Sequence, residues 1–330
     1  MNTETRNKLI VAICLILAAG IAVVAVANDH TKGVFSTSLG KMSSTKLRMA
    51  GERPSAAART RIILLGTGTP QMDPDRSGPA TAIIVDDSAY LIDMGPGVVR
   101  RAAAAAAKGI NAVRPENLKT VFVTHLHSDH TVGYPDLIFT PWVIARKDPL
   151  NVYGPKGLKA MTDHILEAWQ EDINIRTKGL EQKWPLRVVA NEIKAGVVYQ
   201  DNLVRVTAYP ARHGEWKEAY GYRFDTPDRV IVISGDGGPS PELDKACQRC
   251  DILIHEAYSP ASNASMPNWP EYRAHYHTST QQLGEIARQS QPGLLILYHW
   301  MRRVPESQFL AEVGQSYAGK VVMGHDLDVF

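Results

Sequence analysis

Short apolar runs alternate with helix-like apolar periods along most of this chain of 330 residues, starting at Arg61. Apolar residues that recur every three to four positions predict helices at 97–108, 131–146, 157–171, 242–247, 279–288 and 306–317. Short runs rich in Val, Ile, Leu and Tyr predict strands at 62–65, 81–85, 89–92, 121–124, 203–209, 229–234, 252–255 and 294–298. Strands that alternate with helices indicate a layered α/β domain.

The first 27 residues follow a different pattern. Arg6 and Lys8 precede the apolar run 9–27, which ends in Ala25-Val26-Ala27. A basic start, an apolar middle and an A-x-A end are typical of a secretory signal peptide. The run is also long enough for an uncleaved membrane anchor, which needs roughly 20 apolar residues. We favour the signal peptide and expect an exported, periplasmic or extracellular domain; the alternative is a membrane-anchored domain outside the cytosol.

Residues 28–60 are polar and lack a sustained apolar period, so they are interpreted as a flexible tether. The remaining segment, 61–330, shows no internal repeat and no second compositional regime. With 44% hydrophobic residues, the chain can bury one large core. We therefore expect one domain from Arg61 to Phe330, and an oligomer is compatible with the sequence.

Charge and cysteine content restrict the partners that we expect. The formal net charge is +2, and removing Arg6, Lys8 and Glu4 with the leader leaves +1. So small a charge does not predict long-range attraction of a polyanion, so a small substrate is favoured and nucleic acid is not expected. Cys247 and Cys250 are interpreted as ordinary half-buried thiols, with a local disulfide as the alternative in an oxidising compartment.

The segment Thr124-His125-Leu126-His127-Ser128-Asp129-His130 follows the strand-like run 120–123 and carries three imidazoles and a carboxylate. Zn²⁺ binds such donors at about 2.0–2.2 Å, so this composition predicts a metal site at the end of a strand. Alternation along an extended segment places His125 and His127 on one side, and the following turn lets Asp129 and His130 face a second ion. The alternative, a polar surface loop, does not account for this spacing beside a buried strand.

This motif resembles the metallo-β-lactamase superfamily, in its ribonuclease Z-like and arylsulfatase-like branch. The similarity extends from Arg61 to Phe330 and includes the glycine turn 66–70, the segment 91–97, Ala211-Arg212-His213-Gly214, Ser234-Gly235-Asp236 and Leu297-Tyr298-His299. The resemblance implies an α/β fold, the four-layer αββα metallo-β-lactamase sandwich. It also implies a ligand set: one ion held by His125, His127, His213 and Asp236, the other by Asp129, His130, His299 and Asp236.

Two further segments resemble ribonuclease Z more than the lactamases: His255-Glu256-Ala257-Tyr258 and His277-Thr278-Ser279-Thr280. In that branch the residue at His277 donates a proton to the leaving oxygen, and the residue at Glu256 orients it. A general acid of this kind contributes about 10² to 10⁴ in rate. The resemblance thus implies catalytic roles for His277 and Glu256 beside the metal ligand Asp129.

The substrate expected from these features is a small sulfate ester or phosphodiester. Ribonuclease Z carries an arm that grips tRNA, but only residues 224–235 separate Arg223 from Asp236, and the leader points to export. We therefore expect an exported hydrolase with two divalent ions, most readily Zn²⁺, with Mn²⁺ or iron also compatible, and a metal-bridging hydroxide. Alternatives are a ribonuclease Z-type tRNA 3′-processing endoribonuclease, a β-lactam or lactone hydrolase, and a non-catalytic metal-binding module.

Aromatic residues accompany several of the candidate ligands: Trp142, Trp216, Tyr298 and Trp300. They form either the wall of a pocket for an aryl group or nucleobase, or ordinary core packing. The sequence leaves these two interpretations open.

Overall fold

The computed structural model describes residues 58–179, 181, 183–262, 268–301 and 304–330. The leader and nearly all of the tether, residues 1–57, lie outside the described residues, so the export prediction stays a prediction. None of the helices in the described part is long and apolar enough to cross a membrane.

The first of two sheets has six strands in the order of the sequence. Its first three strands form an antiparallel meander, and β3 to β6 are parallel. Strand β2 (AlaThrAlaIleIleVal) is buried along its whole length, as expected for a strand covered on both faces. The strands are β1 (Thr60–Gly66), β2 (Ala80–Val85), β3 (Ser88–Ile92), β4 (Thr120–Phe122), β5 (Leu150–Gly154) and β6 (Val188–Glu192).

The second sheet has seven strands in the order β13-β12-β11-β10-β9-β8-β7. Strands β10 to β13 are parallel, whereas β7 to β10 pair antiparallel. The strands are β7 (Gly196–Gln200), β8 (Arg205–Pro210), β9 (Tyr220–Asp225), β10 (Val230–Ile233), β11 (Ile252–Ala257), β12 (Leu294–Trp300) and β13 (Val321–Met323).

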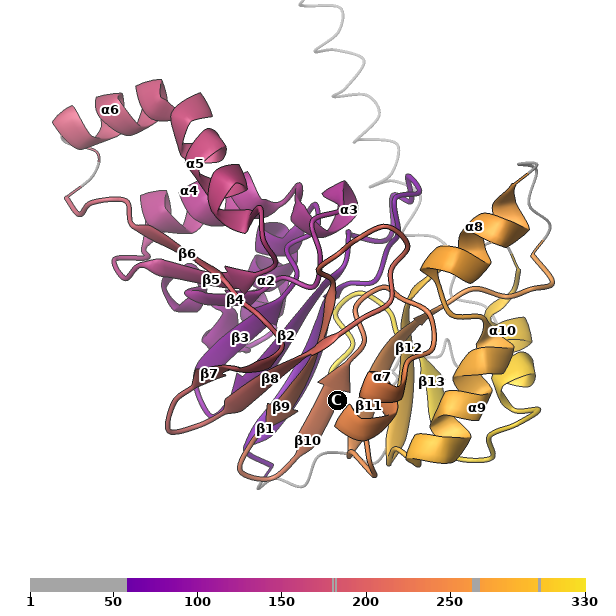
Figure 1. Cartoon of the computed structure of the whole chain (residues 1–330). Coiled ribbons are helices and arrows are strands. Elements are labelled where there is room, and N and C mark those ends of the chain that lie inside the picture. Colours follow the sequence, from indigo (N-terminus) through magenta and orange to yellow (C-terminus); the bar gives the residue numbers. More distant parts are fainter. Residues whose placement is uncertain (1–57, 180, 182, 263–267, 302–303) are drawn as a thin grey trace, which may run out of the picture. The chain divides into compact units, whose positions relative to one another are not determined.

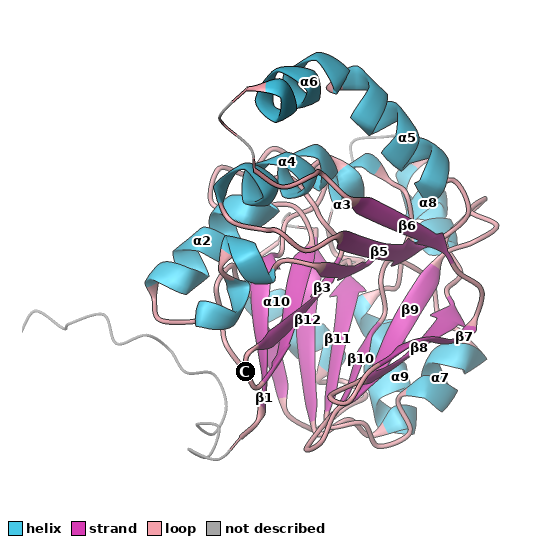
Figure 2. Ribbon diagram, turned by 90° about the vertical axis from the view of Figure 1, so that its left-hand side faces the viewer, coloured by secondary structure: helices cyan, strands magenta, loops and turns pink. Residues whose placement is uncertain are grey.

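Helices cover the outer face of each sheet, as Figures 1 and 2 show. The first sheet packs against α2 (Val98–Ala107), α4 (Tyr134–Ile144) and α5 (Leu158–Ala168), and the second against α7 (Pro241–Ala246), α9 (Thr280–Ser290) and α10 (Glu306–Val313). A third apolar cluster, which includes Ile62, Phe122 and Tyr222, fills the space between the sheets. Three stacked cores confirm the predicted αββα sandwich.

The predicted strands are all present, but several further elements were not predicted. Helix α6 (Gln170–Lys178) has no buried residue, and β6 and β7 are only partly buried, so none of them shows a clear apolar period. The predicted helix 131–146 corresponds to α4 alone, and the short helix α3 (Ser128–Thr131), which precedes it, was not predicted. Helix α8 (Trp269–Tyr276) was also missed, because its apolar residues do not gather on one side.

Arg146 compensates for a proline inside α4. Pro141 has no N–H, so the carbonyl of Leu137, four residues earlier, loses its helical hydrogen bond. The Arg146 guanidinium donates to that carbonyl at 2.8 Å and to the carbonyl of Ile138 at 2.7 Å. Burial lowers the pKa of Arg146 to about 10. The side chain therefore completes the C-terminal half of α4 from inside the core.

Cys247 and Cys250 form a disulfide between α7 and β11. Both residues are almost fully buried, with 0% and 1% exposure. The expectation of two free thiols is therefore wrong, and the alternative of a local disulfide is the one that the structure contains.

Candidate metal centre

The histidine-rich segment lies where β4 ends and α3 begins. The backbone stays extended through His127, with ψ of 148°, and then turns into the short helix that carries Asp129 and His130. His125 and His130 are fully buried, and Asp129 is 9% exposed. The strand end and the helix therefore present the donors of one motif in two groups, as the alternation predicted.

The first group consists of His125, His127 and His213, which follows β8. Nδ1 of His127 lies 2.9 Å from Nε2 of His125 and 3.0 Å from Nε2 of His213. Three imidazole nitrogens therefore converge on one point, which is the donor set that a borderline divalent ion binds. The distant residue His213 is brought to the motif as the resemblance implied.

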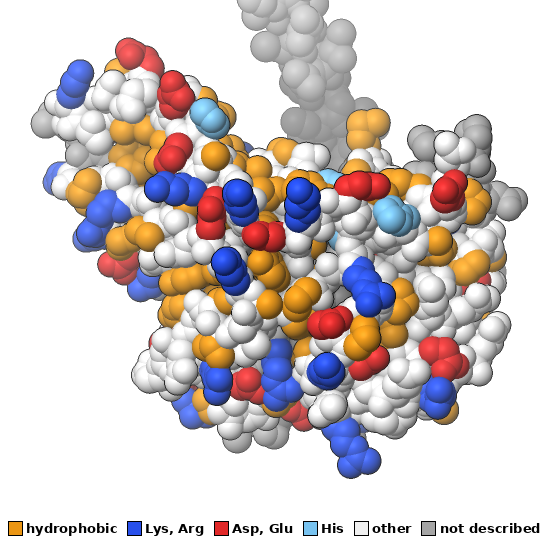
Figure 3. All heavy atoms as spheres, in the orientation of Figure 1, with side chains coloured by type: hydrophobic (Ala, Val, Ile, Leu, Met, Phe, Trp, Pro, Cys, Tyr) orange, Lys and Arg blue, Asp and Glu red, His pale blue; other side chains and the backbone are white. Residues whose placement is uncertain are grey.

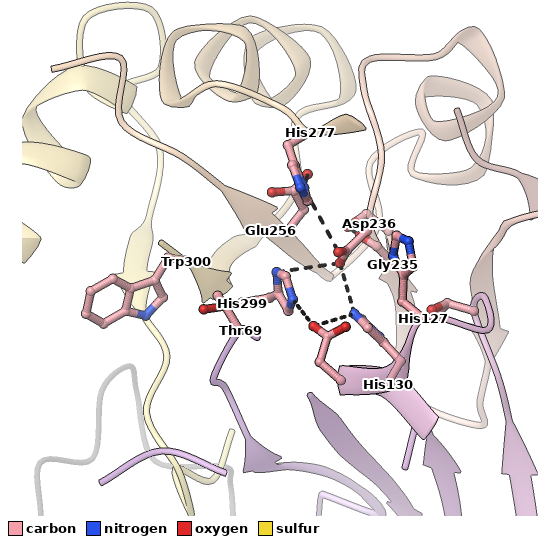
Figure 4. A network of polar contacts seen from close by, with 12 residues as sticks. Thr69, His127, His130, Gly235, Asp236, Glu256, His277, His299 and Trp300 are labelled. Atoms are coloured by element: carbon pink, nitrogen blue, oxygen red, sulfur yellow. Dashed lines mark hydrogen bonds and ion pairs between the residues drawn. The ribbon is translucent and has the colours of Figure 1, made fainter. Parts of the chain in front are cut away.

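The second group contains carboxylates as well as imidazoles. Nε2 of His130 lies 3.4 Å from Oδ1 of Asp236, and Nδ1 of His299 lies 3.6 Å from the same oxygen. Asp129 lies 3.1 Å from Nε2 of His299. Figure 4 shows His130, Asp236 and His299 pointing toward one another, His130 from helix α3 and the other two from the ends of strands β10 and β12. Donor atoms within 4.8 Å of one another form three groups: His125, His127 and His213; His125, His130 and Asp236; Asp129, His130 and His299.

We call these seven residues the donor cluster, and their buried atoms fit a metal. Among the residues that the structure describes, Nε2 of His130, Oδ1 of Asp236 and Nδ1 of His299 are buried without a hydrogen-bond partner. A buried polar atom without a partner costs about 1–3 kcal/mol, and three such atoms directed at one space are explained by a shared cation.

Two backbone features bring the distant donors into place. Gly235 has φ of 63°, and a Cβ there would lie 2.9 Å from Cβ of Thr124. Only glycine allows this turn, which directs Asp236 inward from the end of β10. His299 has φ of 45°, close to the register shift between β11 and β12. Strained residues of this kind concentrate at functional sites.

Hydrogen bonds that two of the buried imidazoles donate to other residues set their tautomers. Nδ1 of His130 donates to Asp93 at 2.8 Å, and Nδ1 of His213 donates to the carbonyl of Tyr276 at 2.7 Å. With hydrogen on Nδ1, Nε2 of each ring is left with a lone pair for a metal. Asp93, which also accepts from the backbone and hydroxyl of Thr124, is a functional residue that sequence reasoning missed. Its position directly after the buried strand β3 was the available signal.

The electrostatics of the donor cluster agree with this assignment. Burial lowers the pKa of His125 well below its usual value and that of His213 to about 4, so both are neutral, as metal ligands must be. For His130, burial opposes the charge, but Asp236, Asp93 and Asp129 raise the pKa well above its usual value. These carboxylates surround one imidazole, so positive charge is favoured at this point.

His277 and Glu256 lie beside Asp236. Nδ1 of His277 is 3.2 Å from Oε1 of Glu256 and 4.0 Å from Oδ2 of Asp236. The Glu256 oxygen also accepts from the backbone of Thr278 at 3.0 Å, and Glu256 is fully buried. Burial opposes the charge on His277, but Glu256 raises its pKa above the usual value. The structure thus brings His277 and Glu256 into hydrogen-bond contact, and their catalytic roles stay a prediction.

A cavity of about 220 Å³ opens over the donor cluster. We call its outer wall the rim: residues 69–71, Tyr272 and Met301. The floor is formed by side chains already described: His127, Asp129, Asp236, His277 and His299. The floor of the cavity therefore carries the reactive groups, and the rim carries groups that can select a substrate.

Of the four aromatic residues for which a pocket wall and core packing were both open, three belong to the core. Trp142, Tyr298 and Trp300 are at most 2% exposed and belong to apolar clusters of the core. Trp216 does lie at the site, where its indole N–H donates to Nε2 of His127 at 2.9 Å. The exposed aromatic of the rim is Tyr272, which sequence reasoning missed because α8 itself was not predicted.

Comparisons with known proteins identify a matching family model, similar sequences and similar solved structures. A family model described as a beta-lactamase superfamily domain matches residues 89–300. Ribonuclease Z of Mycobacterium marinum is 31% identical over 277 residues, which cover 81% of this chain and 96% of that protein. The crystal structure of human tRNase Z, short form, has a TM-score of 0.61 with 21% identity and covers 82% of this chain and 98% of its own. A metallo-beta-lactamase fold protein from Bacillus subtilis has a TM-score of 0.62 with 18% identity, covering 82% of this chain and 99% of its own.

These relatives overturn two expectations. The expectation of a small ester as substrate is wrong, and so is the expectation that nucleic acid is unlikely, because relatives about 30% identical over 81% of the chain are ribonucleases. Of the two ester types expected, these relatives support the phosphodiester and not the sulfate ester. The net charge misled us because it averages over the whole chain, whereas a nucleic acid can be held by a few local contacts. The insertion that is missing between Arg223 and Asp236 also misled us. Its absence removes one possible contact with tRNA but none of the residues of the donor cluster.

Proposed function

Because the chain belongs to the beta-lactamase superfamily and to its ribonuclease Z family, we propose that this metal-dependent hydrolase cleaves RNA phosphodiester bonds, with the 3′ region of precursor tRNA as its substrate. The observation that carries the proposal is the His277–Glu256 pair, placed 4.0 Å from Asp236 at the opening of the donor cluster. Nucleoside oxygens are poor leaving groups, so their departure requires a proton donor at this position.

We propose that the donor cluster holds two divalent ions, Zn²⁺ by preference, through its imidazoles and its two carboxylates. When bound, such ions lower the pKa of a water to about 7 and neutralise charge that develops on the phosphate. Asp93 and the carbonyl of Tyr276 hold the rings of His130 and His213 in the orientation that this binding requires.

His277 is the proposed general acid, and Glu256 is its positioning residue. The bond from Nδ1 of His277 to Glu256 stabilises the protonated ring and leaves Nε2 as the donor to the departing oxygen. Glu256 cannot turn away, because the backbone of Thr278 donates to the same oxygen. The pair is therefore ready before substrate arrives.

On the face drawn in Figure 3, RNA would meet no continuous positive surface. Lysine and arginine side chains are interspersed there with acidic ones. The turn between β9, which ends at Asp225, and β10, which begins at Val230, is too short for an arm, so there is none at this place in the described structure. We therefore propose that local contacts at the rim contribute more to substrate binding than general attraction to phosphates does.

A parallel assay tests this function. The full chain, loaded with Zn²⁺ or Mn²⁺, is offered a precursor tRNA with a 3′ trailer, an aryl phosphodiester and an aryl sulfate. We expect cleavage of the tRNA at one main position, weaker turnover of the aryl phosphodiester and none of the sulfate. Turnover of the sulfate with an intact tRNA would refute the proposal.

A further inference from the structure

A second and larger cavity, of about 620 Å³, adjoins the site beside α8. Tyr272 lines both this cavity and the one over the donor cluster. A substrate that occupies both therefore passes the edge of this ring. The smaller cavity lies over the donor cluster, so the larger one is available to the parts of a substrate that extend away from the reacting group.

The ring of Tyr272 is held in place from behind. It stacks on Tyr276 with centroids 4.6 Å apart and an angle of 24° between the planes. Tyr276 in turn packs edge-on against His213 at 5.3 Å, and its ring covers Gly214, where a Cβ would lie 2.0 Å from the ring. The pair is thus braced against a residue of the donor cluster, although Tyr272 itself is 38% exposed.

The short distance between Tyr272 and His277 indicates which of the two nucleotides at the cleaved bond lies near Tyr272. The centroid of Tyr272 lies 5.8 Å from the ring of His277, the proposed proton donor. A group that receives a proton from His277 is the departing oxygen. The nucleoside attached to that oxygen is therefore the part of the substrate that comes within reach of Tyr272.

The charges of the larger cavity favour a base over a phosphate. Its lining includes the carboxylates of Glu215 and Glu271, and His275 lies 3.4 Å from Glu215. Carboxylates repel a phosphate but accept hydrogen bonds from the amino groups of a base. Aromatic side chains stack on bases of every kind, because each base has a π face.

From these observations we propose that Tyr272, backed by Tyr276, is a stacking platform for the nucleobase of the nucleotide that carries the departing oxygen. This inference rests on the proposed function. In the step itself, the oxygen of water bonds to phosphorus and the bond from phosphorus to the departing oxygen breaks. The electron pair of that bond stays on the departing oxygen, which takes the proton of His277, so the platform holds the product that ends in a hydroxyl group.

The test compares RNA substrates that differ in one base. Three precursor tRNAs are used: one complete, one lacking the base on the hydroxyl-product side of the cleaved bond, and one lacking the base on the other side. Values of kcat/KM are measured for the wild type, Tyr272→Leu and Tyr272→Phe. Trp169→Ala, which removes a 42% exposed ring at the junction of α5 and α6, serves as the matched control. Metal content and melting temperature are recorded for each variant.

Tyr272→Leu is expected to lose about 10-fold to 100-fold in kcat/KM on complete RNA, which is the range for one stacked base. On RNA without the base on the hydroxyl side it should lose little more, whereas Tyr272→Phe, which keeps the ring, should restore most of the loss. Trp169→Ala should match the wild type on all three RNAs.

The wild type alone gives a second measurement, which does not depend on the folding of a variant: it should lose a similar factor when the base on the hydroxyl side is removed. Equal losses by Tyr272→Leu on all three RNAs, or no loss when that base is removed, would overturn the platform alone. If the wild type cleaves none of the RNAs, the proposed function fails, and the platform falls with it.

Discussion

The donor cluster and the rim differ in how firmly the fold holds them. His125, His130 and His299 are at most 1% exposed, whereas Tyr272 is 38% exposed and Met72, next to the rim, is fully exposed. Two imidazoles of the cluster are held by the hydrogen bonds that they donate to Asp93 and to a backbone carbonyl, and the rim is attached through Tyr276 and the loop after β1. Reactive groups are thus built into the core, and groups that can select a substrate are placed around it.

Removing a ligand should have the largest effect. Asp236→Ala takes away the carboxylate that contacts both His130 and His299, so we expect loss of bound metal and no measurable cleavage. Metal analysis of the purified variant together with an RNA cleavage assay checks this. An active Asp236→Ala enzyme that retains its metal would show that the cluster is not the centre of the chemistry.

His277→Ala should separate chemistry from metal binding. We expect full metal content and a loss of about 10² to 10⁴ in kcat on RNA, the usual contribution of a general acid. The loss should be smaller on an aryl phosphodiester, because an aryl oxide leaves without a proton. An equal loss on both substrates would instead indicate that His277 only supports the structure.

Asp93→Asn tests how much the cluster depends on its surroundings. Asparagine keeps the shape of the side chain but removes the charge that faces Nδ1 of His130. We expect metal affinity to fall by about 10-fold to 100-fold, the usual effect of changing a hydrogen-bond partner of a ligand. Competition with a chelator measures the change, and an affinity equal to that of the wild type would show that Asp93 does not support the ligand.

The smallest expected effect concerns the stability of the fold and its dependence on His325, near the C-terminus. A hydrogen bond to Asp328, against the effect of burial and together with Glu306, raises the pKa of His325 from 6.5 to about 9. The folded state binds this proton more tightly than the unfolded state, so the stabilisation is complete below about pH 6.5 and is lost as the pH rises through 9. The group is about half exposed, so the effect is at most about 1 kcal/mol.

Urea unfolding of the wild type and of His325→Gln at pH 6 and pH 9.5 measures this contribution. The wild type should be the more stable of the two at the lower pH, and the difference should shrink at the higher pH. A difference that does not change with pH would mean that the ion pairs of His325 contribute nothing.

The sequence predicted the donor cluster better than the rim, for physical reasons. Four of the seven donors stand within six positions, and metal chemistry restricts the residue types that can stand there. His213, Asp236 and His299 were assigned by resemblance, because nothing in the local sequence shows that they meet. Asp93 was missed because a single carboxylate after a strand is common in proteins and does not by itself indicate contact with a metal ligand.

The rim and the partners were harder to predict. Tyr272 lies on α8, which has no apolar stripe that would reveal the helix, and Trp142 and Trp300, which stand near the predicted ligands in sequence, are buried in the core. Adjacency in the sequence does not determine which side of a strand or helix faces a cavity. The substrate was misjudged for a related reason, since net charge and a missing insertion describe the surface as a whole and not the local contacts.

The ends of the cleaved RNA test the central claim most directly. A precursor tRNA is cleaved by the full chain with Zn²⁺ or Mn²⁺, and both new ends are identified by enzymatic labelling and mass spectrometry. We expect one main cut that leaves a hydroxyl on one fragment and a monophosphate on the other, because water supplies the new oxygen and His277 protonates the old one. A 2′,3′-cyclic phosphate at the new end, or no cut at all, would contradict it.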